Sequence, residues 1–228
     1  MLASPLEPLR ESEVEESVSD LVDAPTVFIV DDDISVRESL EHLVAAAGWR
    51  PETFASAQAF LARAPAAGPS CLVLDVNLPD LNGLDLQDKV GADQTEMPII
   101  FITGYGDVPM TVRAMKAGAM EFLTKPIDKH ALLAAVGDAI ERSQAAADHG
   151  AESRMLRARY ERLTPREREI LAMVVEGLLN KQVAADLGIS EITVKAHRGR
   201  MVRKMKAATF ADLVKMGERL GIGTPQKG

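Results

Sequence analysis

The sequence predicts an α/β domain with a doubly wound parallel sheet, joined by a helical linker to a small all-α domain of four helices. Between residues 25 and 142, five short apolar or β-branched runs alternate with helical patterns, which is typical of a parallel sheet covered on both faces. The last third of the 228 residues contains helical patterns only. From residue 154 onward there are 16 Lys and Arg against 8 Asp and Glu, whereas the preceding residues hold 10 against 26. The basic part is therefore expected to bind a polyanion.

The elements of the α/β domain follow from this alternation. The expected strands are TVFIV at 26–30, RPETF at 50–54, CLVLD at 71–75, PIIFIT at 98–103 and EFLTK at 121–125. Helices are expected over 35–47, 56–64, 84–90, 109–117 and 129–143. Residues 1–24 are acidic and lack aromatic side chains, so they predict a flexible N-terminal extension.

The single cysteine, Cys71, lies in an apolar run, which excludes an internal disulfide and predicts a buried thiol. No apolar run approaches the roughly 20 residues of a membrane span, and the N-terminus lacks the order of a secretory signal. We therefore expect a cytoplasmic protein with no membrane partner.

Polar side chains follow four of the expected strands. Ligands of a doubly wound sheet bind at the carboxyl ends of its strands. The polar residues at these ends are Asp31, Asp32 and Asp33 after the first strand, Asp75, Thr103 and Lys125.

These residue types together indicate phosphoryl chemistry. Carboxylates brought close raise one another's pKa unless a cation joins them, and Mg²⁺, with Mn²⁺ as an alternative, suits such a set of oxygen ligands. Lys125 and Thr103 would face an anion. Because GYG at 104–106 lacks the spacing of a nucleotide-binding loop, we expect a carboxylate, best Asp75, to accept the phosphoryl group itself.

The motifs VDDD, LDVNLPDLNG, ITG and KP, in this order, resemble the receiver domain of two-component response regulators over residues 26–142. The resemblance implies a flavodoxin-like (βα)₅ fold and transfer of a phosphoryl group from a histidine kinase to Asp75. It also implies an Mg²⁺ site formed by Asp31, Asp32, Asp75 and the backbone carbonyl of Asn77, with Asp32 the more direct ligand. Asp33 lies outside this site and is expected to stand at the start of a helix.

The same resemblance assigns a conformational switch. Thr103 matches the switch hydroxyl, Lys125 the phosphate-binding lysine and Phe122 the switch aromatic, although Phe122 is equally well explained as a core side chain. Pro126 matches a cis-proline turn. Tyr105 departs from the small or acidic side chains common at its position, which leaves the lifetime of the phosphorylated state open.

The basic third reads as helix, glycine turn, helix. Thr164, Pro165 and Glu167 form a capping box with a first-turn proline, and Ser190 caps a third helix that extends to about residue 205. Its apolar side is expected to contain Ile192, Val194, Met201 and Met205, and the remaining surface is cationic. This pattern predicts a helix-turn-helix that contacts DNA.

LTPRERE, NKQVA, LGIS and TVKAH resemble the LuxR/GerE-type DNA-binding domain of FixJ/NarL-class response regulators. The resemblance places Lys195 and Ala196 against base edges. The residues that it places near the DNA backbone are Asn180, Lys181, Thr193 and His197. Gly199 stands where some members have a base-reading lysine, so Arg198 or Arg200 is expected to take over.

Two segments remain. Residues 143–162 predict a helical linker, interrupted at His149 and Gly150, between a receiver at 25–142 and a DNA-binding domain at 163–228. The last helix, over 209–220, resembles a dimerisation helix with Leu213 and Met216 as contact candidates; packing on its own domain is the alternative.

The sequence therefore predicts a transcriptional regulator, not an enzyme, that is phosphorylated at Asp75 by a histidine kinase, forms a homodimer and binds promoter DNA. An aspartyl-phosphate hydrolase is the first alternative, but position 77 is Asn, where a second acid/base carboxylate would be wanted. A phosphorylation-independent DNA-binding protein with a degenerate receiver is the second, and the intact set of polar residues argues against it.

Overall fold

The computed structural model describes residues 24–66, 68–93, 97–104 and 106–223. The chain divides between Asp148 and His149 into two compact units. The predicted N-terminal extension, apart from residue 24, lies outside the described residues, as does Tyr105.

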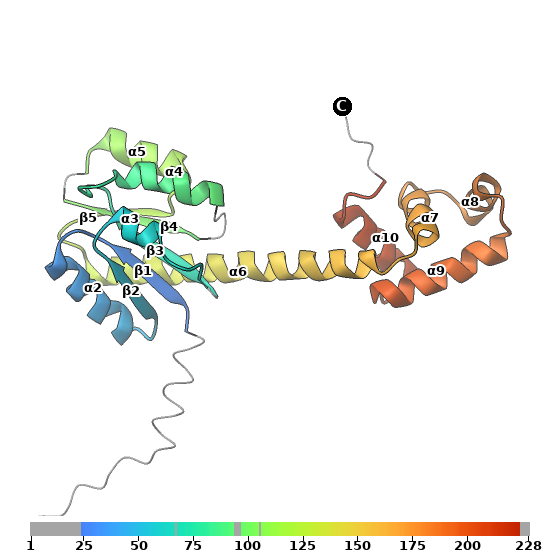
Figure 1. Cartoon of the computed structure of the whole chain (residues 1–228), viewed down its shortest axis with the longest axis horizontal. Coiled ribbons are helices and arrows are strands. Elements are labelled where there is room, and N and C mark those ends of the chain that lie inside the picture. Colours follow the sequence, from blue (N-terminus) through green and yellow to red (C-terminus); the bar gives the residue numbers. More distant parts are fainter. Residues whose placement is uncertain (1–23, 67, 94–96, 105, 224–228) are drawn as a thin grey trace, which may run out of the picture. The chain divides into compact units, whose positions relative to one another are not determined.

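A five-stranded parallel sheet forms the centre of the first unit (Figure 1). Its order is β2-β1-β3-β4-β5, so the order reverses between β1 and β3. The strands are β1 (Thr26–Val30), β2 (Arg50–Phe54), β3 (Ser70–Asp75), β4 (Ile99–Thr103) and β5 (Glu121–Thr124). β1, β3 and β4 are buried along their whole length, which accounts for their apolar sequences.

Helices cover both faces of this sheet. They are α2 (Ile34–Ala46), α3 (Ala57–Leu61), α4 (Gly83–Asp93), α5 (Val108–Lys116) and α6 (Lys129–Glu161). Leu40 and Val44 of α2 pack with Leu132 and Val136 of α6 on one face, whereas α3, α4 and α5 contribute to the core on the other. The predicted doubly wound α/β fold is confirmed.

Cys71 lies inside the sheet and is fully buried. Burial raises the pKa of its thiol to about 12, because the charged thiolate is poorly solvated there. The predicted role as a buried side chain is confirmed.

The predicted interruption at His149 and Gly150 is wrong, since α6 continues from Lys129 to Glu161 without a break. One glycine costs a helix only about 1 kcal/mol, and the alanines and long charged side chains around it are good helix formers. Near the middle of α6, the Ser143 hydroxyl accepts a 3.0 Å hydrogen bond from the backbone N–H of Ser70 at the start of β3. Among the described residues, no helix is both long and apolar enough to span a membrane.

The second unit contains four helices beyond the end of α6. They are α7 (Pro165–Val175), α8 (Asn180–Leu187), α9 (Glu191–Met205) and α10 (Phe210–Arg219). α8 ends at Gly188, which adopts a left-handed conformation (φ 62°) and turns the chain toward α9, and Ser190 caps α9 as predicted. The packed second and third helices thus form the predicted helix-turn-helix.

Glu167 holds the start of α7 and the end of α9 together. Its side chain is 2% exposed and accepts hydrogen bonds from the Thr164 N–H at 2.8 Å and from Lys204 Nζ at 2.6 Å. Burial alone would raise the pKa of Glu167, but the bonds from Lys204 and Thr164 outweigh it, and the pKa lies below its usual value of 4.5.

We expect Glu167→Gln to lower the free energy of unfolding of the second unit by about 1–3 kcal/mol at neutral pH, because the bonds from Lys204 and from the Thr164 N–H both lose the negative charge of their acceptor. Since the folded-state pKa of Glu167 is depressed, its contribution is complete above pH 4.5 and is lost as the pH falls through the folded value. Hydrogen exchange of the α7 amides across this pH range would measure both effects.

Glu169→Gln is the matched control, since Glu169 forms an exposed ion pair with Arg166 worth at most about 1 kcal/mol. Equal losses in the two variants, or a Glu167→Gln loss that persists in acid, would contradict the assignment.

Candidate functional site

Three charged side chains meet at the carboxyl end of the sheet. Lys125 Nζ lies 2.6 Å from Asp31 Oδ2 and 2.6 Å from Asp75 Oδ2, so one ammonium bridges the carboxylates that follow β1 and end β3. Asp31, Asp32 and Asp75 each place a carboxylate oxygen within 4.8 Å of the other two. Asp31 and Asp75 are buried, whereas Asp32 is exposed.

The electrostatics of this acidic pocket follow from burial. Desolvation raises the pKa of Asp31, although bonds from Lys125 and the Asp33 N–H oppose the shift. Burial would lower the pKa of Lys125, but its bonds to Asp31 and Asp75 outweigh this and raise it. Lys125 is therefore held in its charged form by the two carboxylates.

The donor set also fits a hard divalent cation. Three carboxylates from two strand ends offer only oxygen atoms, which Mg²⁺ and Mn²⁺ prefer, and the exposed Asp32 leaves room for water ligands. The single positive charge of Lys125 does not balance three negative ones. A cation in this pocket would reduce the remaining repulsion.

Thr103 and Asn77 stand beside this pocket. Thr103 at the end of β4 is fully buried, and its hydroxyl accepts a 3.2 Å hydrogen bond from Asn77 Nδ2. The Asn77 N–H donates to Asp75 Oδ1 at 3.0 Å. From the sequence, Asn77 was expected to contribute only its backbone carbonyl. Its side-chain amide also contacts Thr103, which the sequence did not indicate, because the two residues lie 26 positions apart at the ends of different strands.

The loop after β1 is held by its own side chains. Asp33 caps α2 by accepting from the Ser35 N–H, as predicted. Arg37 donates to the Asp31 carbonyl oxygen at 2.6 Å, a contact that sequence reasoning missed. The backbone that carries the acidic pair is thereby bonded to the first turns of α2.

Phe122 is half-buried on β5, with its ring centroid 6.2 Å from that of Phe101. This contact is compatible with a core role and with a switch role. The Lys125–Pro126 peptide bond is cis, as the resemblance implied.

Gly83 packs directly against the strand that carries Asp75. Its N–H donates to the Val76 carbonyl at 2.9 Å, and a methyl group on Gly83 would lie 2.5 Å from the Asp75 carbonyl oxygen. Only glycine fits here without moving the backbone next to Asp75.

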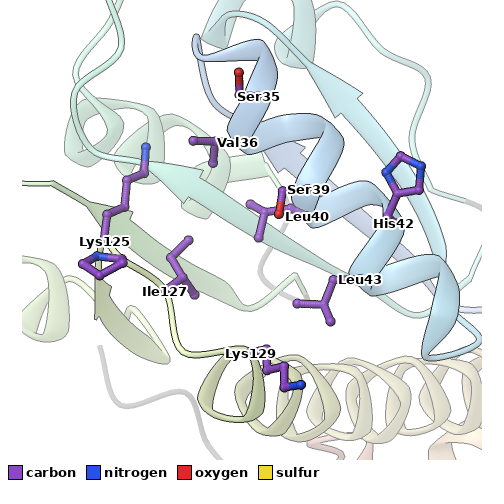
Figure 2. A pocket seen from close by; sticks show the side chains of 10 residues that line it. Ser35, Val36, Ser39, Leu40, His42, Leu43, Lys125, Ile127 and Lys129 are labelled. Atoms are coloured by element: carbon purple, nitrogen blue, oxygen red, sulfur yellow. The ribbon is translucent and has the colours of Figure 1, made fainter.

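A cavity of about 680 Å³ lies beside Lys125, between α2 and the connection from β5 to α6 (Figure 2). Val36, Leu40 and Leu43 of α2 and Ile127 on the opposite side give it an apolar lining. Ser35 and Lys129 add polar groups to its wall.

Five of the eight side chains predicted to contact DNA are exposed in the second unit. Those exposed are Lys181 on α8 and Thr193, Lys195, Ala196 and Arg200 on α9. Val194, Met201 and Met205 are buried on the other side of α9, as expected. Ile192 does not belong to that buried side, since it is 78% exposed.

Arg198 is directed into the domain. Its Nη1 donates to Asn180 Oδ1, and its guanidinium carbon lies 3.2 Å from the centroid of the Phe210 ring. Burial lowers its pKa. The structure therefore does not bring Arg198 to the exposed face of α9, and of the two arginines expected to replace a lysine at Gly199, Arg200 alone is exposed there.

The other predicted residues of this unit are less accessible. Asn180 is half-buried through its bond to Arg198, and His197 is half-buried with its Nδ1 atom enclosed. Leu213 of α10 is fully buried in the core of its own unit, and Met216 packs against that core. This placement favours the alternative for α10, packing on its own domain.

Comparison with known proteins matches the two units to two families. Residues 27–137 match the response regulator receiver domain, and residues 161–217 match the luxR family of bacterial regulatory proteins.

Several relatives align with this chain over a length that includes both units. Nodulation protein W of Bradyrhizobium diazoefficiens is 48% identical over 196 residues, 86% of each chain. Transcriptional regulatory protein FixJ of Rhizobium meliloti is 42% identical over 87% of this chain and 97% of its own. The solved structure of response regulator StyR, 43% identical, aligns with a TM-score of 0.77 over 86% of this chain and 99% of its own.

We expect Gly83→Ala to destabilise the first unit by about 1–3 kcal/mol, because the added methyl group must displace the backbone at Asp75 and Val76. Gly137→Ala in α6 is the control, since its methyl group would meet no atom within 4 Å and should leave stability unchanged or raise it by up to about 1 kcal/mol. Urea unfolding followed by fluorescence of Trp49, the single tryptophan, measures both. A Gly83→Ala protein as stable as the wild type would show that this contact is not tight.

Proposed function

Because the chain belongs to the two-component response regulators with a receiver domain and a LuxR-type DNA-binding domain, we propose that phosphorylation of Asp75 by a histidine kinase controls its binding to promoter DNA. The protein is a transcriptional regulator and not an enzyme, which excludes the aspartyl-phosphate hydrolase alternative. We propose that it acts in the cytoplasm as a homodimer.

The observation that carries this proposal is the bridge from Lys125 to Asp31 and Asp75. In the transfer, an Asp75 oxygen attacks the phosphorus atom of a phosphohistidine, the P–N bond breaks and an acyl phosphate forms. After the transfer, Lys125 can donate to an oxygen of the phosphoryl group on Asp75 where it now donates to the Asp75 carboxylate. Its charge opposes the negative charge that accumulates during transfer.

We propose that Asp31, Asp32, Asp75 and the backbone carbonyl of Asn77 hold Mg²⁺, or Mn²⁺ in its place. When bound, the ion supplies positive charge to the phosphoryl oxygens. The donor set described above supports this assignment, because the one ammonium, bonded to Asp31 and Asp75, does not balance the charge of three carboxylates.

The switch is proposed to start at Thr103. Its hydroxyl now accepts a bond from Asn77, and it can instead donate to a phosphoryl oxygen on Asp75. Phe122 would follow the movement of Thr103, which alters the surface of α5 and β5. Phosphorylation would in this way shift an existing equilibrium between two conformations.

The DNA contact is proposed for α9. Lys195 and Ala196 are exposed for base edges, while Lys181, Thr193 and Arg200 are exposed for the DNA backbone or neighbouring bases. In a dimer, two such helices would occupy half-sites about one helical turn apart. The proposed domain extents are 25–142 for the receiver, 143–162 for the linker and 163–228 for the DNA-binding domain.

We expect Asp75→Asn to abolish phosphorylation by acetyl phosphate with Mg²⁺, because an amide is not a nucleophile for this transfer. Intact mass spectrometry measures the added phosphoryl group, and sedimentation and promoter binding at fixed salt measure its effect. Asp33→Asn is the matched control, since Asp33 only caps α2 and Asn is also a good N-cap. Equal phosphorylation of Asp75→Asn and wild type would overturn the assignment of Asp75.

We expect Lys195→Ala to weaken specific DNA binding by about 1–3 kcal/mol, because a base-reading cation is lost. Fluorescence anisotropy with specific and unrelated duplexes at several salt concentrations measures the change. Arg157→Ala removes an equal charge from an exposed site on α6 and should weaken both duplexes slightly and equally. A Lys195→Ala effect that is the same for both duplexes would contradict base reading.

A further inference from the structure

Ile192 is the most exposed of the large apolar side chains in the described residues, at 78%. It occupies the second position of α9, directly after the Ser190 cap and Glu191. Neither the cap nor the core requires an isoleucine here. Ser190 satisfies the first turn by accepting from the Thr193 N–H, and the core side of α9 is filled by Val194, Met201 and Met205.

The position of Ile192 on the helix relates it to the proposed base readers. Residues three and four apart are neighbours on a helix surface, so Ile192 lies beside Lys195 and Ala196. Gly199 continues the same face one turn further and adds no side chain. The outer face of α9 thus presents an apolar group, a cation and a small residue in succession.

The chemistry of this face matches the floor of the DNA major groove. A recognition helix contacts base edges with its N-terminal residues, and thymine alone presents a methyl group there. The isoleucine side chain cannot bond to a phosphate, since it has no donor. The cationic side chains Lys195 and Arg200, on a basic third of the chain, supply the charge complementarity that brings DNA to this face.

We propose that Ile192 reads the C5-methyl group of a thymine in the major groove and so adds an apolar contact to the specificity of α9. The inference rests on the proposed DNA binding by α9. The expected partner is a DNA duplex in which a thymine lies next to the base pairs that Lys195 and Ala196 read.

The test isolates the methyl group. The full chain, with Mg²⁺ and acetyl phosphate, selects sites from a random duplex pool. Each thymine in the selected site is then replaced singly by 2′-deoxyuridine, which lacks only this methyl group. Affinities are measured for the wild type, for Ile192→Ala, and for Met155→Ala, which shortens another apolar side chain, 56% exposed, on α6.

We expect the effect of removing the methyl group to depend on Ile192 at one thymine of the site. Loss of that methyl group should weaken binding by the wild type and by Met155→Ala about fourfold, the effect of removing one buried methyl-sized group. Ile192→Ala should bind the two duplexes equally. Ile192→Leu, which keeps an apolar group at this position, should retain a preference for thymine.

Other outcomes overturn the inference separately from the proposed function. If the wild type selects a site but no deoxyuridine substitution distinguishes it from Ile192→Ala, the thymine contact is wrong and the proposed DNA binding by the protein stands. The same holds if the selected site contains no thymine. If the wild type selects no sequence and binds no duplex, both the inference and the proposed function fail.

Discussion

The bridge from one ammonium to two carboxylates is the interaction on which the first unit depends. Asp31, Asp75 and Lys125 are 44 to 94 residues apart in the chain, and only a parallel sheet with β1, β3 and β5 in place brings them together. Desolvation of Asp31 opposes this arrangement, and Lys125 opposes the repulsion between the carboxylates. Lys125 thus offsets part of the negative charge of the pocket, and the charge that remains is available to a metal ion.

Much of the fold and of this pocket could be predicted from the sequence. Buried parallel strands are apolar along their length, so their ends are evident, and polar residues at those ends must share one rim. The contacts of Arg37 and Asn77 could not be predicted, because they depend on side-chain directions within loops. The break expected at Gly150 fails for a different reason: a glycine weakens a helix locally, while its neighbours decide whether the helix continues.

In the second unit, too, some side-chain contacts could not be predicted from the sequence. Helical periodicity places Arg198 among the cations of α9, but an aromatic ring on α10 and an amide on α8 bind it inside the domain. Lys204 is likewise engaged by Glu167. The basic composition of this part therefore overstates the charge that is free to meet a polyanion, because these two cations are already engaged within the domain. A single sequence does not reveal which cations are used internally.

The residues that pack α9 into its domain differ from those proposed to contact DNA. Val194, Met201 and Met205 are buried and hold the helix in its domain, whereas Ile192, Lys195 and Ala196 are exposed. Substitutions on the outer side should therefore cost little folding stability. After gene duplication, one copy can acquire new target promoters by changing these positions while its folding and its input domain are retained. Because folding and base contact depend on different residues of α9, the DNA sequence that such a regulator binds can change without loss of its fold.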